Sequence, residues 1–376
     1  MKTPRGKPLS LPLSALTLAA ALLACGGEDA PPPPENPAPI TDEQGECIEK
    51  PTFTENVSTC APLSTDYQPR GAGSSQDTWA ACISDDNTYH RLYPSISTIG
   101  RVAAFEAIAD ALWRKTKVPT VEDFTQARLR YTESEGLGSR VERREDVHYP
   151  SAPAACNSSA SIPTEHPERC VGPAKLRPLV NEAFASGMRG ETPGVNAARI
   201  EAALLWFLYV SPLSEVTSCT TKDADCDSAW AYYTGGTTRN EPVGLARYVS
   251  DLAPETHARA YDATLAVRCW RDLDRAVPAT NLALRDQARA QLDTALLRGM
   301  AVIVRQRFQE LACTSGEAKA ARWAFLQVLV PLMDREARAR NPTLADALVN
   351  QVGKARPDDV DVPAALSALD TLFACP

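Results

Sequence analysis

Two carboxylates lie four residues apart in the stretch AFEAIADAL, residues 104–112. On a helix Glu106 and Asp110 would share one face, since residues at this spacing are neighbours on the helix surface. Hard divalent cations prefer carboxylate oxygens as ligands. The pair is therefore a candidate metal or ligand site. The alternative is a solvated acidic stripe opposite Phe105 and Ile108.

A second candidate is the aromatic stretch CDSAWAYYTGG, residues 226–236. Asp227 is placed to cap the start of a helix, and Tyr232 would point toward Glu201 or Arg199 of the preceding helix. This stretch could line a ligand pocket, or its rings could pack in the core with their phenol hydroxyls hydrogen-bonded. The candidate ligand-binding residues of the chain are Glu106, Asp110, Glu201, Asp227, Tyr232 and Tyr233.

Signatures of common enzymes are absent from the sequence. There is no G-x-S-x-G, no H-E-x-x-H and no G-x-x-x-x-G-K-[ST], which argues against a serine hydrolase, a zincin and a P-loop NTPase. No histidine has a second one three or four residues away, so no helix carries a two-histidine metal site. We therefore predict no catalytic residue and expect a protein that is not an enzyme.

The candidate residues must be positioned by helices, which the sequence predicts from its periodicity. Apolar residues at three- and four-residue spacing predict a helix over residues 95–115. Thr120 and Asp123 resemble a capping box for a helix that ends before Gly136. Two more helices are expected over residues 175–186 and 196–210, the second one central and ended by Pro212.

The C-terminal half shows the same periodicity, with five helices predicted over residues 254–276, 281–311, 315–340, 344–352 and 363–373. Pro331 is expected to kink the third of these. Residues 136–173 lack periodicity and should form an irregular surface segment. No strand pattern or long repeat is evident. The fold class is therefore all-α, an irregular multi-helix bundle formed by one domain over residues 47–376, with an alternative subdivision near residue 190.

The chain contains 11 cysteines and no C-x-x-C motif. Without Cys25 ten remain, and an even number in an exported chain implies disulfides. Three pairs are close in sequence and flank loop-like stretches, and a fourth would fix the C-terminus. The predicted disulfides are Cys47–Cys60, Cys156–Cys170, Cys219–Cys226 and Cys313–Cys375.

The first 24 residues have the pattern of a signal peptide. Lys2, Arg5 and Lys7 precede an apolar run that is short for a membrane span and ends in LLAC. This ending resembles the lipobox of bacterial lipoproteins, whose cysteine is lipidated. We expect Cys25 to anchor the protein outside the cytoplasm, on a bacterial membrane, with the outer membrane or cell surface favoured.

An acidic, proline-rich stretch follows, residues 25–46, and predicts a disordered tether. Removal of the leader takes the formal net charge from −8 to −11. Nucleic acid is excluded as a partner, because a basic face is its usual footprint. The expected partners are the membrane, through the lipid, and a metal ion or a protein.

The order of segments in the C-terminal half resembles the low-iron-inducible, iron-assimilation-type secreted proteins of algae and some bacteria. The similar segments are residues 196–219, 226–236, 243–270 and 317–333, with the turn WAYYTGG as the most specific. The resemblance implies an extracytoplasmic helical protein of iron acquisition, with iron or another divalent metal as its ligand. It assigns no metal ligands in this sequence.

Three functions are compatible with these observations. The first is a membrane-anchored helical binding lipoprotein that captures iron, another metal or a small ligand. The second is a ligand-free interaction scaffold on the cell surface. The third is an imelysin-like peptidase, which is disfavoured because no histidine stands in a G-x-H-x-x-E motif.

Overall fold

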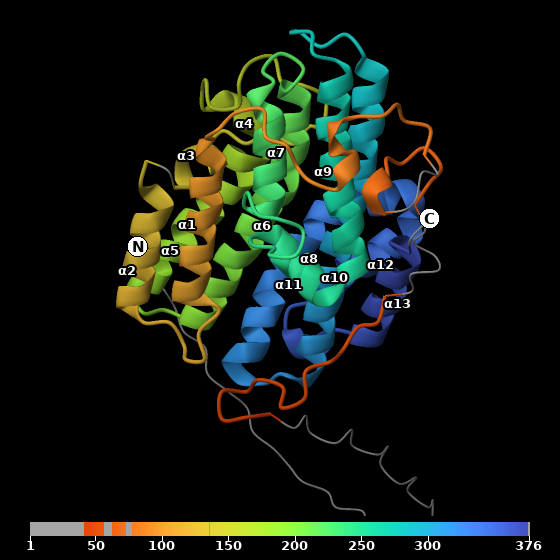
Figure 1. Ribbon diagram of the computed structural model, residues 1–376. Coiled ribbons are helices and arrows are strands. Elements are labelled where there is room, and N and C mark those ends of the chain that lie inside the picture. The colour runs from red at the N-terminus through yellow and green to blue at the C-terminus, as the bar shows by residue number, and fades with distance from the viewer. Residues whose placement is uncertain (1–40, 56–61, 73–76, 135, 375–376) are drawn as a thin grey trace, which may run out of the picture. The chain divides into compact units, whose positions relative to one another are not determined.

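Helices form nearly all the regular structure of the computed structural model, which describes residues 41–55, 62–72, 77–134 and 136–374 (Figure 1). Thirteen α-helices and no strand occur within these ranges. The only extended pairing among them is an isolated bridge between Thr41 and Cys47. The all-α prediction is therefore confirmed.

The N-terminal helices follow the predicted periodicity. Thr120 caps α2 as expected, because its hydroxyl accepts from the Asp123 amide at 3.3 Å while the Asp123 carboxylate accepts from the Thr120 amide at 2.8 Å. Residues 136–173 carry only two short helices. The helices of this half are α1 Ser97–Leu112, α2 Val121–Thr132, α3 Gly138–Val141, α4 Ser161–Glu165, α5 Arg177–Met188, α6 Pro193–Ser218 and α7 Ala224–Thr234.

The helices α9 to α13 also lie close to their predicted bounds, whereas α8 was not predicted. Asn281 and Asn341 cap α10 and α12, since each side chain accepts a hydrogen bond at 3.1 Å from a backbone amide of the first turn. Pro331 lies inside α11. The helices are α8 Leu245–Leu252, α9 Pro254–Leu273, α10 Leu282–Cys313, α11 Gly316–Arg340, α12 Pro342–Val352 and α13 Val362–Leu372.

Helix α6 does not end at Pro212, as predicted, but continues to Ser218. A proline inside a helix costs about 3 kcal/mol. Leu213 and Val216 beyond it are fully buried, and each contributes about 1.5–3 kcal/mol through burial. Tertiary packing therefore outweighs the helix break. The Ser211 hydroxyl also donates to the Phe207 carbonyl in the turn before the proline.

Helix α6 is the centre of the core and packs against α5, α7 and α11 (Figure 1). On the other side, α10 packs against α9 and α11, and α12 and α13 pack on each other and on α11 and α10. All described residues belong to one unit, Pro39–Pro376. None of the helices within them has the length and apolarity needed to cross a bilayer.

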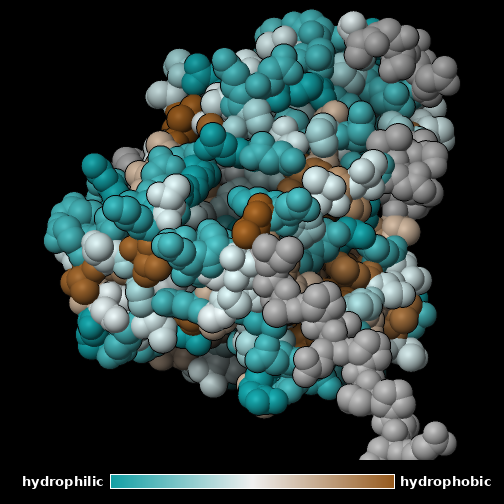
Figure 2. Space-filling view, turned by 90° about the horizontal axis from the view of Figure 1, so that it is seen from below, coloured by the Kyte–Doolittle hydropathy of each residue, from teal (hydrophilic) through white to brown (hydrophobic). Residues whose placement is uncertain are grey.

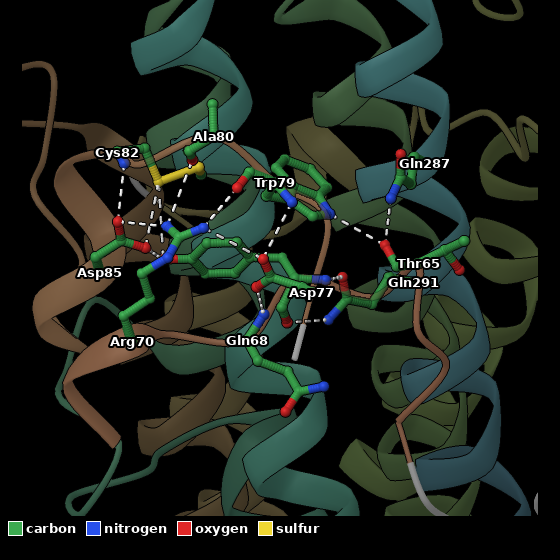
Figure 3. Close-up of polar contacts among 12 residues, drawn as sticks. Thr65, Gln68, Arg70, Asp77, Trp79, Ala80, Cys82, Asp85, Gln287 and Gln291 are labelled. Carbon is green, nitrogen blue, oxygen red and sulfur yellow. Dashed lines mark hydrogen bonds and ion pairs between the residues drawn. A yellow bond between two sulfur atoms is a disulfide. The ribbon is translucent and has the colours of Figure 1, made fainter. Parts of the chain in front are cut away.

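A polar cluster holds residues 65–72 and 77–85 on α9 and α10 (Figure 3). The backbone of Tyr67 exchanges two hydrogen bonds with the Gln291 side chain, at 2.9 and 3.0 Å. Its buried hydroxyl donates to Asp85, which also pairs with Arg70 at 2.7 Å. Burial and the Asp85 contact raise the pKa of Tyr67. Cys82, in the same cluster, is bonded to Cys269 on α9.

Four disulfides join described cysteines. Cys156–Cys170 and Cys219–Cys226 confirm the predictions made for those pairs, and such bonds indicate an oxidising, extracytoplasmic environment. The predictions Cys47–Cys60 and Cys313–Cys375 were wrong, because Cys47 is bonded to Cys313 with their Cα atoms 5.3 Å apart. Proximity in sequence does not reveal this pair, which is 266 residues apart.

The predicted tether extended too far. Residues 41–46 lie on the helical unit, where the Gly45 carbonyl accepts from the Ser315 amide at 2.8 Å and Glu46 pairs with Arg322 at 2.6 Å. Backbone and ion-pair contacts with the α10–α11 turn thus order a segment that lacks apolar residues. The rest of the tether, the leader, Cys25, Cys60 and Cys375 lie outside the described residues.

Candidate functional site

A cleft of about 990 Å³ opens at the end of the bundle where α1 ends and α11 begins. Figure 2 views this end and shows a hollow surrounded mainly by hydrophilic side chains. Its walls are the α1–α2 connection, the start of α6, the helix α8, the second half of α10, the start of α11 and part of the segment over residues 42–50. Six chain segments that are distant in sequence therefore contribute to one cavity.

Glu106 and Asp110 share a helix face, as expected, but they bind a cation of the protein itself. Arg114 donates to both oxygens of Glu106 at 2.7 and 2.9 Å and to Asp110 at 3.2 Å. Burial opposes ionisation of Glu106, but the hydrogen bonds from Arg114 and the Gly244 amide outweigh it and lower the pKa of this carboxyl. The arrangement fixes α1 against the turn before α8 and gives both carboxylates a partner, Arg114, within the protein.

Asp227 does not cap α7, because Asp223 does so by accepting from the Ala224 amide at 3.0 Å. Asp227 lies inside the helix and is fully buried. Its carboxylate accepts from the Tyr89 hydroxyl and from the amides of Leu92 and Tyr93, at 2.8–3.1 Å. Its role in the structure is to hold residues 89–93 on α7.

The aromatic stretch is part of the core. Tyr232 does not reach Glu201 or Arg199 but packs edge-on against Phe207, with the guanidinium of Arg144 5.1 Å from its ring centre. Tyr232 is not among the residues that line the cleft. Trp230 stacks on Tyr89 at 4.4 Å.

Tyr233 forms a buried hydrogen bond with His257, in which the phenol oxygen lies 2.9 Å from Nδ1. The second ring nitrogen, Nε2, lies 2.9 Å from the Arg239 carbonyl. A neutral imidazole satisfies both, with Nε2 donating and Nδ1 accepting. Burial lowers the pKa of His257, in agreement with a neutral ring.

Two predicted candidates line the cleft, Asp110 at the end of α1 and Glu201, which lies on its floor. Glu201 is 4% exposed. Its Oε1 accepts from the Tyr248 hydroxyl at 2.9 Å and from Arg307 at 2.7 Å. The Tyr248 oxygen in turn accepts from the Trp113 indole nitrogen at 2.6 Å. Within the described part of the chain, Oε2 of Glu201 accepts no hydrogen bond.

The floor continues as a buried ion-pair network. Arg307 also donates to Glu310 at 2.8 Å, and Arg322 pairs with both Glu310 and Glu46 at 2.6 Å. Burial opposes ionisation of Glu310, but the two arginines prevail and lower its pKa to about 2. Three carboxylates thus face two guanidinium groups, an excess of one negative charge.

The rim of the cleft is more exposed and carries both signs. Lys50 and Lys117 are exposed cations that line it, and Asp251 is an exposed carboxylate on α8. Exposed charges such as these are screened by salt over about 8–10 Å. The charges of Glu201, Arg307 and Glu310 are screened less, because these side chains are largely buried, whereas the Glu46 side chain in the same network is 37% exposed.

Sequence reasoning missed Trp113, Tyr248, Arg307 and Glu310. The sole local signal was the placement of Arg307 and Glu310 three apart near the apolar face of a long helix. Nothing in that spacing indicates Glu201, 106 residues earlier, as a partner. The described residues contain no group of three or more His, Cys, Asp or Glu side chains arranged to hold a metal ion.

Comparisons of the chain with protein-family models, with curated proteins and with solved structures found no match. The chemistry of the site therefore has to be argued from its own residues. The cleft combines a deep, fixed, negatively charged floor with apolar walls and a polar rim. This arrangement can bind and orient a small molecule.

Proposed function

We propose that this protein is an extracytoplasmic binding protein that captures a small molecule in the cleft above Glu201. One observation supports this most directly, the cleft of about 990 Å³ with an ordered polar floor. Ligand sites are usually clefts of about 300–1,000 Å³ with apolar walls and a few fixed polar groups. Here Ala197, Ala198 and Ile303 contribute apolar wall, and Glu201 is the central polar group.

The place of action follows from the N-terminal sequence. We propose that the leader is removed, that Cys25 carries the lipid, and that the protein is held on the outer membrane or cell surface. The signal-like leader and the LLAC ending support this proposal. A Cys25→Ala variant should be released from membranes, and mass spectrometry of the wild type should show an acylated Cys25. An unmodified cysteine would contradict it.

The link to iron depends on the resemblance of the C-terminal segments alone. Because the described residues offer no preformed cluster of metal-ligating side chains, we propose an organic molecule as the ligand and not a bare ion. Transcript levels under iron limitation test the link separately. A metal-acquisition role would require induction, whichever molecule the cleft binds.

The binding function can be tested with the mature, oxidised protein and a library of small soluble compounds. A ligand present at 100 times its dissociation constant should stabilise the fold by about 2.7 kcal/mol, which a thermal-shift assay detects. Ala198→Phe fills the cleft, so it should abolish the shift. Ala312→Phe, at an exposed position of α10 outside the cleft, is the control and should keep it.

Absence of any stabilising compound would contradict the binding function and would favour the interaction scaffold. Equal loss of the shift in both variants would also contradict the cleft as the site, because only Ala198 lines it.

A further inference from the structure

We infer that the cleft selects small organic cations, and that it binds their ammonium group at Oε2 of Glu201 beside the rings of Trp113 and Tyr248. This inference rests on the proposed binding function and names the class of ligand. It depends on the charge of the floor, on the unused oxygen of a buried carboxylate and on the two aromatic side chains next to it.

The charge of the floor favours a cation. Glu201, Glu310 and Glu46 are connected through Arg307 and Arg322, so the network carries one more negative than positive charge, and its third carboxylate, Glu46, is 37% exposed. Each guanidinium already contacts two carboxylates, so its positive charge is paired within the protein. One added monovalent cation would make the network neutral.

The unused oxygen gives the cation a defined position. Glu201 is only 4% exposed, yet it lines the cleft. Oε1 already accepts two hydrogen bonds, whereas Oε2 accepts none from the described residues. Because Glu201 lines the cleft, this oxygen can accept a hydrogen bond from a ligand there. A protonated amine would donate to it in a charge-assisted hydrogen bond, which is about twice as strong as a neutral one, and a quaternary ammonium would be attracted to it by charge without a hydrogen bond.

The aromatic side chains are held in place next to that oxygen. Tyr248 bonds Glu201 directly, and its hydroxyl is fixed by the Trp113 indole. Phe105 packs edge-on against both rings, at 5.8 and 6.4 Å between centres. Both Trp113 and Tyr248 line the cleft and are half-buried. Aromatic rings attract cations through their faces, by about 0.5–2 kcal/mol.

Other ligand classes fit less well. An anion would meet rim cations such as Lys50, Lys117 and Arg247, which are exposed and screened by salt, and the buried carboxylate of Glu201 on the floor would repel it. A divalent metal ion needs several oxygen ligands, and here one buried carboxylate oxygen is free. The geometry points to a monovalent organic cation.

The test compares three probes of nearly the same shape, namely choline, its neutral isostere 3,3-dimethylbutan-1-ol and the anion 3,3-dimethylbutanoate. Each is titrated into ¹⁵N-labelled full-length mature protein. The readout is the indole N–H signal of Trp113, which is assigned as the signal that disappears in Trp113→Phe. We expect choline to shift it in a saturable manner, with at least 10-fold tighter binding than either other probe. Butylammonium serves as a second cation.

Two matched variants separate a specific contact from general electrostatics. Glu201→Gln and Asp251→Asn each remove one carboxylate charge from the same cleft. We expect Glu201→Gln to weaken choline binding at least 10-fold and Asp251→Asn to weaken it less than 3-fold. If Glu201→Gln does not fold, the comparison of the three probes on the wild type still tests whether the cleft prefers a cation.

Equal binding of choline and its neutral isostere would overturn the inference, as would preference for the anion or equal effects of the two variants. Failure of both cations, in a protein that other library compounds stabilise through the cleft, would also overturn it and leave the proposed function standing. Failure of every compound would contradict the binding function itself.

Discussion

Glu201 on α6 and Arg307 on α10 are 106 residues apart in sequence and joined by a hydrogen bond of 2.7 Å on the floor of the cleft. Both are largely buried, with side-chain exposures of 5% and 16%. The contact connects the central helix to the helix that forms the opposite wall. Burial opposes the charge of Arg307, but Glu201 and Glu310 outweigh it and raise the pKa of the guanidinium.

Removal of Arg307 should therefore destabilise the fold strongly. Arg307→Met leaves Glu201 and Glu310 buried with fewer partners, and breaking a buried ion pair costs about 3–5 kcal/mol. Urea unfolding of the oxidised protein measures this loss. Arg130→Met, which removes an exposed pair with Glu133, should leave the midpoint nearly unchanged. Similar midpoints for the two variants would mean that the floor network contributes little to stability.

Alkaline pH should weaken a second buried contact. The ring nitrogens of His148 lie 2.6 Å from Asp146 and 2.9 Å from Asp293. Burial disfavours the charged ring, but the two carboxylates prevail and raise the pKa of His148 to about 9. Since the folded pKa is above the unfolded value of about 6.5, the stabilisation is complete below pH 6.5 and disappears as the pH rises through 9.

His148→Phe, which keeps a ring beside Tyr209, should remove this part of the pH dependence. The measurement is the free energy of unfolding in urea at intervals from pH 6 to pH 10, for the wild type and the variant. Parallel curves over the whole range would show that His148 is not the titrating group.

The disulfide between Cys47 and Cys313 should hold one wall of the cleft. Cys47→Ser with Cys313→Ser removes it, and we expect a loss of about 2–4 kcal/mol in stability. Residues 41–50 should become sensitive to proteases, because the bond attaches this segment to the end of α10. Cys156→Ser with Cys170→Ser is the control and should not expose residues 41–50. Peptide mapping of the wild type must find Cys47 linked to Cys313, and a different linkage would refute the arrangement.

The turn after α7 should not tolerate a side chain at Gly235. This residue has φ +71°, and an added Cβ would lie 2.0 Å from a methyl carbon of Val243. We expect Gly235→Ala to cost about 1–2 kcal/mol for the left-handed backbone and about 1–3 kcal/mol more for overpacking. Gly316→Ala has a similar φ of +55° with nothing within 4 Å, so it should show the backbone cost alone. Thermal unfolding compares the two, and equal costs would argue against the close approach of Val243.

The fold class could be predicted from local sequence because helix periodicity and capping depend on neighbouring residues. Thr120 with Asp123, and the caps Asn281 and Asn341, illustrate this. The two disulfides that close short loops, Cys156–Cys170 and Cys219–Cys226, were accessible for the same reason.

What depends on packing could not be predicted from local sequence. Pro212 stays inside α6 because residues on both sides of it are buried in the core. Of the six candidate ligand residues, Asp110 and Glu201 line the cleft, and Glu201 does so because α6 packs beside α10 and α8.

The sequence by itself determined the helices, their caps, the short disulfide loops and the expectation of export, since each depends on residues close together in the chain. Only the tertiary structure decided that Cys47 bonds Cys313 and that Glu201 meets Arg307, Tyr248 and Trp113. These contacts join segments far apart in sequence, and no local spacing encodes which helix faces which. The cleft and its charge follow from that packing.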